Sequence, residues 1–174
     1  MSHAATLRRD LLIGYLSVAA VAAHVLEANL PGLGPWFKPG LANIFTVVAF
    51  FHLDRFAAVA VTLIRVLGAS IAMGTLLSPT FMLSLSGATG TVMVMLIVPL
   101  LLPGIGPVGL SILMALAHMS MQLWVAQLLF IQHAGLFLIM PWFLLAAWLT
   151  GGINGLIAYG LMQRLKQRRD LQPL

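Results

Sequence analysis

The 174-residue sequence contains no cysteine and very little charge. Without cysteine the chain cannot form a disulfide, ligate zinc or an iron–sulfur cluster through thiolates, or use a thiol nucleophile. Aspartate and glutamate together number 4, too few for a cluster that holds magnesium against a diphosphate. There is no Walker phosphate-binding loop, so ATP hydrolysis would have to come from another chain. These absences argue against an independent catalytic site, and we expect neither enzyme activity nor a metal or other cofactor in this chain alone.

Apolar residues, in contrast, are in excess. They make up 61% of the chain, and the mean hydropathy is +1.04, well above the range of soluble domains. One crossing of a hydrocarbon core about 30 Å thick takes roughly 20 helical residues, so the chain has room for about six crossings and no separate soluble domain. We therefore predict an all-α, multi-pass integral membrane protein whose single transmembrane domain covers residues 1–174.

Proline, glycine and charged residues divide the apolar sequence into helices, since the apolar runs are too continuous for periodicity to place their ends. The predicted helices cover residues 10–30, 41–53, 55–77, 80–102, 107–132 and 136–164, and a basic tail covers 164–174. The second helix is too short to cross the bilayer upright unless the loop before it dips inward. The segment from Gly104 to Gly109 matches the glycine pattern of a dinucleotide-binding loop. It joins two predicted membrane helices and no strand precedes it, so we interpret it as a turn.

The basic residues predict the orientation of the bundle. With an even number of crossings, Lys38 alone lies on one side. The other side carries Arg8, Arg9, Arg55, Arg164, Lys166, Arg168 and Arg169. Such an excess marks the cytoplasmic face, so both termini are predicted inside a bacterial cytoplasmic (inner) membrane, surrounded by lipid rather than nucleic acid. The basic and apolar N-terminus also fits a signal peptide with a cleavage site at Ala20–Ala22, which would leave five crossings.

A few polar side chains interrupt the apolar helices, and at membrane depth such groups normally face the bundle or a wet cavity. Arg65 lies ten residues after Arg55, about 15 Å further along a helix that rises 1.5 Å per residue, and therefore near the middle of the bilayer. Asp54 is too far away to pair with it, whereas Glu27 lies near the outer end of the first helix. Two interpretations follow: a structural Glu27–Arg65 ion pair, or an Arg65 that binds an anionic ligand or lines a wet cavity.

Other patterns predict the faces on which helices meet. Four residues on the fifth helix recur at steps of four, three and four, which places them on one stripe. They are Ser111, Ala115, His118 and Gln122. This stripe faces either polar partners on the sixth helix, such as Asn154, or a ligand. Small residues four apart, including Ser86 with Gly90 and Gly151 with Gly155, predict close contacts between helices.

Five short segments, in order along the chain, resemble a known bacterial family. They are Lys38-Pro39-Gly40-Leu41-Ala42-Asn43-Ile44, Arg65-Val66-Leu67-Gly68, Ser86-Gly87-Ala88-Thr89-Gly90, Ala117-His118 followed by Gln122, and Thr150-Gly151-Gly152-Ile153-Asn154-Gly155. Their order and spacing over residues 10 to 165 are similar to the Gx transporter family, also labelled heptaprenyl diphosphate synthase component I. Met119 stands where that family usually has an amide after the histidine, so no role is carried over to this position.

That family is similar to the S components of energy-coupling factor (ECF) transporters, six-helix membrane proteins that bind vitamins and related micronutrients. The resemblance implies an S-component-like bundle that captures a small-molecule solute from outside. We expect ligand contacts at Asn43, Arg65, His118 and Gln122, and next at Glu27 and Lys38. Arg65 would neutralise a carboxylate or phosphate, Asn43 would hydrogen-bond the ligand, and Lys38 would attract an anion at the entrance.

The resemblance also implies protein partners. S components dock their membrane coupling subunit through an Ala-xxx-Ala face, which Ala19 and Ala23 match in spacing, and ATPases then supply the energy. The other family label implies a different function, a non-catalytic membrane component associated with prenyl diphosphate (heptaprenyl or quinone) synthesis. A third alternative is a membrane subunit of a flavin or quinone redox assembly, although no cofactor motif in the chain supports it.

Overall fold

The computed structural model describes residues 3–29 and 40–170, which are helical apart from short turns. The elements are α1 (His3–Asn29), α2 (Ala42–His52), α3 (Arg55–Ala72), α4 (Pro79–Leu101), α5 (Pro107–Ala126), the π-helical turn η1 (Gln127–Ile131) and α6 (Gly135–Asp170). No strand occurs in the described part of the chain. The prediction of an all-α protein is confirmed.

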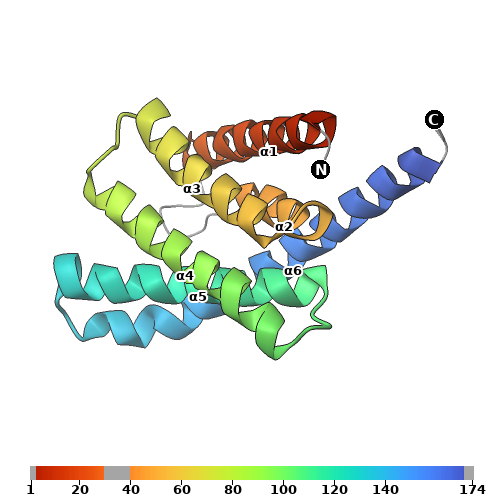
Figure 1. Cartoon of the computed structure of the whole chain (residues 1–174). Helices are drawn as coiled ribbons and strands as arrows, with labels where there is room; N and C mark the ends of the chain where they lie inside the picture. Colours follow the sequence, from red (N-terminus) through yellow and green to blue (C-terminus); the bar gives the residue numbers. More distant parts are fainter. Residues whose placement is uncertain (1–2, 30–39, 171–174) are drawn as a thin grey trace.

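Five of these segments are long and apolar enough to cross a membrane. They are Thr6–Asn29, Arg55–Ala72, Pro79–Leu101, Pro107–Ile131 and Gly135–Gln167. The exception, α2, has 11 residues, about 17 Å of helix, too short to cross a hydrocarbon core about 30 Å thick by itself. The multi-pass character is confirmed. The placement of both termini in the cytoplasm stays a prediction, although the beginning of α1 and the end of α6 do lie at the same end of the bundle (Figure 1).

Some of the predicted helix boundaries differ from the observed ones because of glycine and polar residues near the helix ends. α3 stops at Ala72 rather than continuing to Leu77, because Gly74 adopts a left-handed conformation with φ of +66°. The N–H of Gly74 then bonds to the carbonyl of Ile71, and that of Thr75 to Ser70, which is the Schellman ending of a helix. α1 begins at His3, before the predicted start at residue 10, and α6 ends at Asp170, after the predicted end at residue 164. Arginine, lysine and glutamine, which favour helix, continue these helices past the apolar segments.

The bundle consists of two groups of three helices. α1, α2 and α3 pack on one another, as do α5 with α4 and with α6, and contacts between the groups are fewer. In Figure 1 the first group, coloured red to yellow, lies above α5 and most of α4, while the C-terminal end of α6, in dark blue, rises to the level of α1. We call them the N-terminal half (α1–α3) and the C-terminal half (α4–α6).

Glycines allow close packing within the C-terminal half. A Cβ added at Gly155 of α6 would lie 2.6 Å from Cα of Val108 in α5, and one at Gly90 of α4 would lie 2.6 Å from the carbonyl oxygen of Ala117 in α5. Real side chains do not approach this closely, so α5 contacts the backbone of both neighbours. The close helix contacts predicted at these small residues are present.

The N-terminal half is held by polar contacts at both ends of α1. Near its beginning, Arg9 donates from Nε (3.1 Å) and Nη2 (2.7 Å) to Oδ2 of Asp54. The other oxygen of Asp54, Oδ1, caps α3 by accepting from the N–H of Ala57. Near its end, Glu27 accepts a hydrogen bond from the N–H of Leu41, just before α2. The bonds from Arg9 and from the backbone of Ala57 hold the pKa of the Asp54 carboxyl below its ordinary value.

Candidate functional site

A cavity of about 120 Å³ lies where the two halves meet, and every one of the six α-helices contributes to its wall. By the same measure one water molecule needs about 10–15 Å³, so the space suits a small organic molecule. Polar side chains line much of it: His24, Glu27, Asn43, Arg65, Ser84, His118, Gln122, Thr150 and Asn154. The apolar wall is formed by Met114, Ala115, Met119, Ala146 and Ala147.

The structure brings together most of the residues that the sequence nominated for ligand binding. The predicted residues on this wall are Glu27, Asn43, Arg65, His118 and Gln122. Lys38 lies outside the described residues, and Ala19 and Ala23, nominated for docking, lie half-buried on α1 away from the cavity wall. The convergence is geometric, and contact of these side chains with a ligand stays a prediction.

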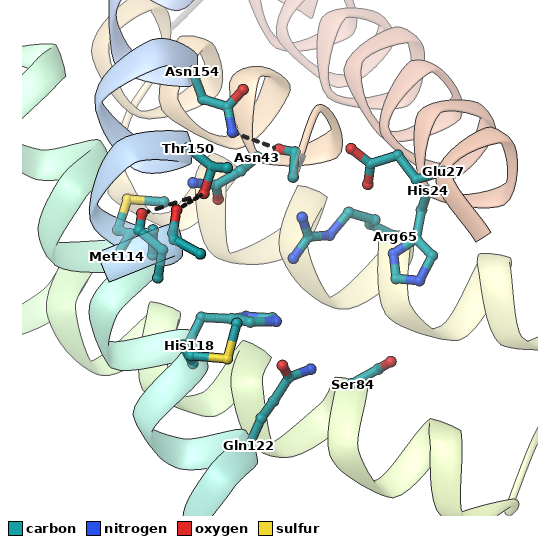
Figure 2. Close-up of a pocket in the computed structure, with 15 residues that line it drawn as sticks. His24, Glu27, Asn43, Arg65, Ser84, Met114, His118, Gln122, Thr150 and Asn154 are labelled. Atoms are coloured by element: carbon teal, nitrogen blue, oxygen red, sulfur yellow. Dashed lines mark hydrogen bonds between the residues drawn. The ribbon is translucent and has the colours of Figure 1, made fainter. Parts of the chain in front are cut away.

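Arg65 is the central cation of the cavity. Its side chain comes from α3 and is only 5% exposed, and Figure 2 shows its guanidinium directed toward the middle of the pocket. The Nε atom is buried and has no hydrogen-bond partner among the described residues. Glu27 acts on the guanidinium electrostatically. Because a buried cation needs acceptors to compensate for lost hydration, this atom leaves part of the requirement unmet.

Residues 40 and 41, at the edge of the cavity, are held from two sides. Leu41 donates its N–H to Glu27 of α1, and Asn154 of α6 donates from Nδ2 to the carbonyl oxygen of Gly40 at 3.1 Å. Gly40 has φ of +72°, and a Cβ there would meet Asn154 at 3.1 Å. The sequence suggested Asn154 as a packing partner for the stripe on α5, and this bond to the start of α2 was not foreseen.

His118 is held against α4. Its Nδ1 lies 3.2 Å from Oγ1 of Thr91, and a Cβ at Gly87 would lie 2.5 Å from both Cε1 and Nε2 of the ring. The ring therefore packs on the bare backbone at Gly87. Within the segment Ser86 to Gly90, one glycine admits the histidine ring and the other admits the backbone of α5.

A comparison with protein families now places the chain. The model of one family, described as heptaprenyl diphosphate synthase component I, matches residues 16–161. The chain belongs to this family. The match includes every residue that lines the cavity, so the pocket of this component I protein lies wholly within the family region. No curated protein and no solved structure matches the chain.

Several cavity residues of this component I protein were missed by sequence reasoning. They are His24, Met114, Met119, Ala146, Ala147 and Thr150. A signal existed for Met114, which lies one turn before His118 on the same stripe, and for Thr150, which begins the segment that ends at Gly155. The alanines on α6 gave none, because that helix is apolar on every face and its sequence does not show which face lies inward.

Proposed function

We propose that this membrane component is a solute-binding protein, similar to the S components of ECF transporters, that captures a small anionic molecule for uptake. The observation that supports this proposal is the buried Arg65 guanidinium on the cavity wall, whose Nε lacks a hydrogen-bond partner among the described residues. A carboxylate or phosphate group would supply charge-assisted hydrogen bonds to this cation. Such a ligand would compensate for a burial that otherwise costs several kcal/mol.

The rest of the wall supports an organic ligand rather than a bare ion. Met114 and Met119 offer adaptable apolar surface, while Asn43 and Gln122 offer amide groups. Small-molecule sites commonly combine an apolar wall with a few polar groups that orient the ligand. The polar groups would fix one end of the solute at Arg65, and the methionines would cover its apolar part.

Energy would come from other subunits. The family description, component I, implies at least one further component, and the sequence has no phosphate-binding loop of its own. We propose that α1 docks a membrane coupling subunit through Ala19 and Ala23, whose side chains are only half-buried. ATPases attached to that subunit would drive the uptake.

A second candidate function is favoured by the family description itself. The chain would be a non-catalytic membrane component of prenyl diphosphate synthesis, with Arg65 holding a diphosphate. The chemistry would belong to a partner, since diphosphate ionisation uses metal-bridging carboxylates. The described residues include no group of three or more His, Cys, Asp or Glu side chains placed to hold a metal ion.

The test is native mass spectrometry of gently solubilised full-length protein, because it reports bound partners and small molecules together. We expect a small anion bound to the wild type, and we expect Arg65→Met to insert normally but to bind that anion about 10- to 150-fold more weakly, the loss of one charged hydrogen bond. Arg55→Met is the matched control, since Arg55 begins the same helix and is exposed.

Two results decide between the candidates. Copurification with an ATPase-coupled membrane subunit supports transport, whereas copurification with a soluble, aspartate-rich prenyl synthase supports the second function. Equal anion binding by Arg65→Met and Arg55→Met, measured by calorimetry, contradicts the ligand role of Arg65 in either function.

A further inference from the structure

The polar side chains on the cavity wall fall into two groups. In the first group the side chain has a hydrogen-bond partner within the protein, as for Glu27, His118, Thr150 and Asn154. In the second group the side chain makes no hydrogen bond with any described residue. Its neutral members are Asn43, Ser84 and Gln122. The hydrogen-bonding capacity of these three side chains is therefore available to a bound molecule.

Gln122 and Ser84 reach the cavity from the C-terminal half. Gln122 belongs to α5 and is only partly buried, and Figure 2 shows its amide directed into the pocket below Arg65. Ser84 of α4 is 8% exposed. Its hydroxyl does not bond to a carbonyl of the preceding turn, as that of Ser86 does to Leu83 at 2.8 Å, although helical serines commonly make this local bond. Both side chains are thus left to interact with an occupant of the cavity.

The amide of Gln122 limits the groups that can satisfy it. It presents N–H donors and a carbonyl acceptor next to each other. A ketone or carboxylate on the ligand only accepts, and would leave the Gln122 carbonyl without a donor. An amide, lactam or ureide group offers a carbonyl and an N–H at the same spacing, so it can form both bonds at once. An unpaired polar group in a buried site costs about 1–3 kcal/mol, which favours such a complementary group.

We propose that the cavity selects small anions that also carry an amide, lactam or ureide group, and that Gln122 is the residue that determines this specificity. The anion binds Arg65, from the N-terminal half, and the amide group binds Gln122, from the C-terminal half, with Ser84 as a further hydrogen-bonding group. Asn43 also has an amide without a partner among the described residues, but it is buried and presents less surface than Gln122. This inference rests on the proposed function, because it names the ligand class of the same cavity.

The first test compares probes that differ only in the amide. Succinamate is paired with levulinate, and glutaramate with γ-acetylbutyrate. Within each pair the carboxylate and chain length are the same, and a methyl ketone replaces the primary amide. Binding is measured by calorimetry on the full-length protein in lipid nanodiscs. We expect the amide to bind about tenfold more tightly or better than the ketone in the pair whose length fits the cavity.

Two results of this comparison would overturn the inference. Equal affinities within both pairs would show that the amide is not recognised, and would leave the anion site intact. Absence of binding by all four probes would also overturn the inference, while the anion site is judged separately by native mass spectrometry. The comparison uses the wild-type protein and does not depend on the folding of any variant.

The second test assigns the preference to one side chain. Gln122→Met removes the amide at nearly constant length, and Gln132→Met is the matched control, since Gln132 is exposed and lies outside the cavity wall. We expect the ratio of amide to ketone affinity to fall to one or below in Gln122→Met and to keep its wild-type value in Gln132→Met. An unchanged ratio in Gln122→Met would overturn the assignment to Gln122. A parallel loss of both affinities at an unchanged ratio would show that this side chain is merely structural, and would overturn it as well.

Arg65→Met distinguishes failure of the inference from failure of the proposed function. We expect this variant to bind all four probes more weakly while the ratio of amide to ketone affinity stays at its wild-type value. Unchanged affinities in Arg65→Met would contradict the anion site of the proposed function and, with it, the anionic part of the inferred ligand class. Weaker binding in Arg65→Met, together with a wild-type ratio of one, would support the anion site and refute the inference alone.

Discussion

The closest backbone contact between α5 and α6 leads to a quantitative prediction about stability. Replacing Gly155 with alanine places a methyl group 2.6 Å from Cα of Val108 and 3.0 Å from Cβ of Ser111. An ordinary contact begins at 3.4 Å, so the two helices must separate by most of an ångström at this point. Neither neighbour is the flexible end of a side chain, and strain cannot be relieved by a rotamer change.

The magnitude follows from a comparison with Gly160 on the same helix. A Cβ at Gly160 meets nothing within 4 Å. Both Gly→Ala changes gain about 1 kcal/mol in helix propensity, and this gain cancels in their difference. What remains is the packing cost at Gly155, about 1–3 kcal/mol for inserting a methyl group into a packed interface. A gap of 0.5 to 1 Å already forfeits roughly a quarter to a half of the contact energy of the atoms it separates.

The assay is equilibrium unfolding by titration with sodium dodecyl sulfate, followed by tryptophan fluorescence. Three of the four tryptophans lie on these helices, Trp124 on α5 and Trp142 and Trp148 on α6, so most of the signal reports on the two helices that must separate. We expect Gly155→Ala to be less stable than Gly160→Ala by about 1–3 kcal/mol. Equal stabilities of the two variants would refute the close packing on which the C-terminal half depends.

Two further contacts predict measurable effects. Asp54→Asn keeps the cap of α3 but removes the charge that pairs with Arg9. Because both side chains are more than a third exposed, we expect the free energy of unfolding to fall by less than about 1 kcal/mol. The pKa of Asp54 is lower in the folded state than its ordinary value of about 3.9. The ion pair therefore contributes its full stability at a pH above that ordinary value, and the contribution is lost as the pH falls through the folded pKa. The unfolding curves of wild type and Asp54→Asn should converge in acid, and a stability difference that does not change with pH would contradict this. Asn154→Leu removes one of two hydrogen bonds to the carbonyl of Gly40, which still accepts from the N–H of Asn43, and should cost about 0.5–1.5 kcal/mol in the same detergent titration. Ile153→Leu on the exposed face of α6 should change little, and equal effects of the two substitutions would be inconsistent with the bond.

Burial in lipid explains which parts of the site could be predicted. A polar side chain in an apolar helix must face protein or water, so Asn43, Arg65, His118 and Gln122 could be nominated from sequence alone, and all of them line the cavity. An alanine or methionine side chain can face either lipid or protein at little difference in free energy. The apolar wall therefore depends on the rotation of each helix, which only packing determines.

Contacts between segments far apart in the chain could not be predicted from the sequence either. The bond from Asn154 to Gly40 spans 114 positions, and that between Thr91 and His118 spans 27, and nothing local specifies either. The early end of α3 was different in kind. The predicted helix over 55–77 continued past Gly74 to the Ser78–Pro79 pair, which instead starts α4 with a serine cap and a proline in the first turn.

The position of the cavity between the N-terminal and C-terminal halves has a practical consequence. Because the cavity wall comes from both halves, any molecule that occupies it is at the same time a cross-link between them. By mass action, an occupant present at 100 times its dissociation constant adds about 2.7 kcal/mol to the stability of the folded state. The melting temperature of the solubilised protein is therefore a direct readout of occupancy, and a thermal-shift screen of metabolite mixtures tests compounds of many chemical classes for binding in the cavity.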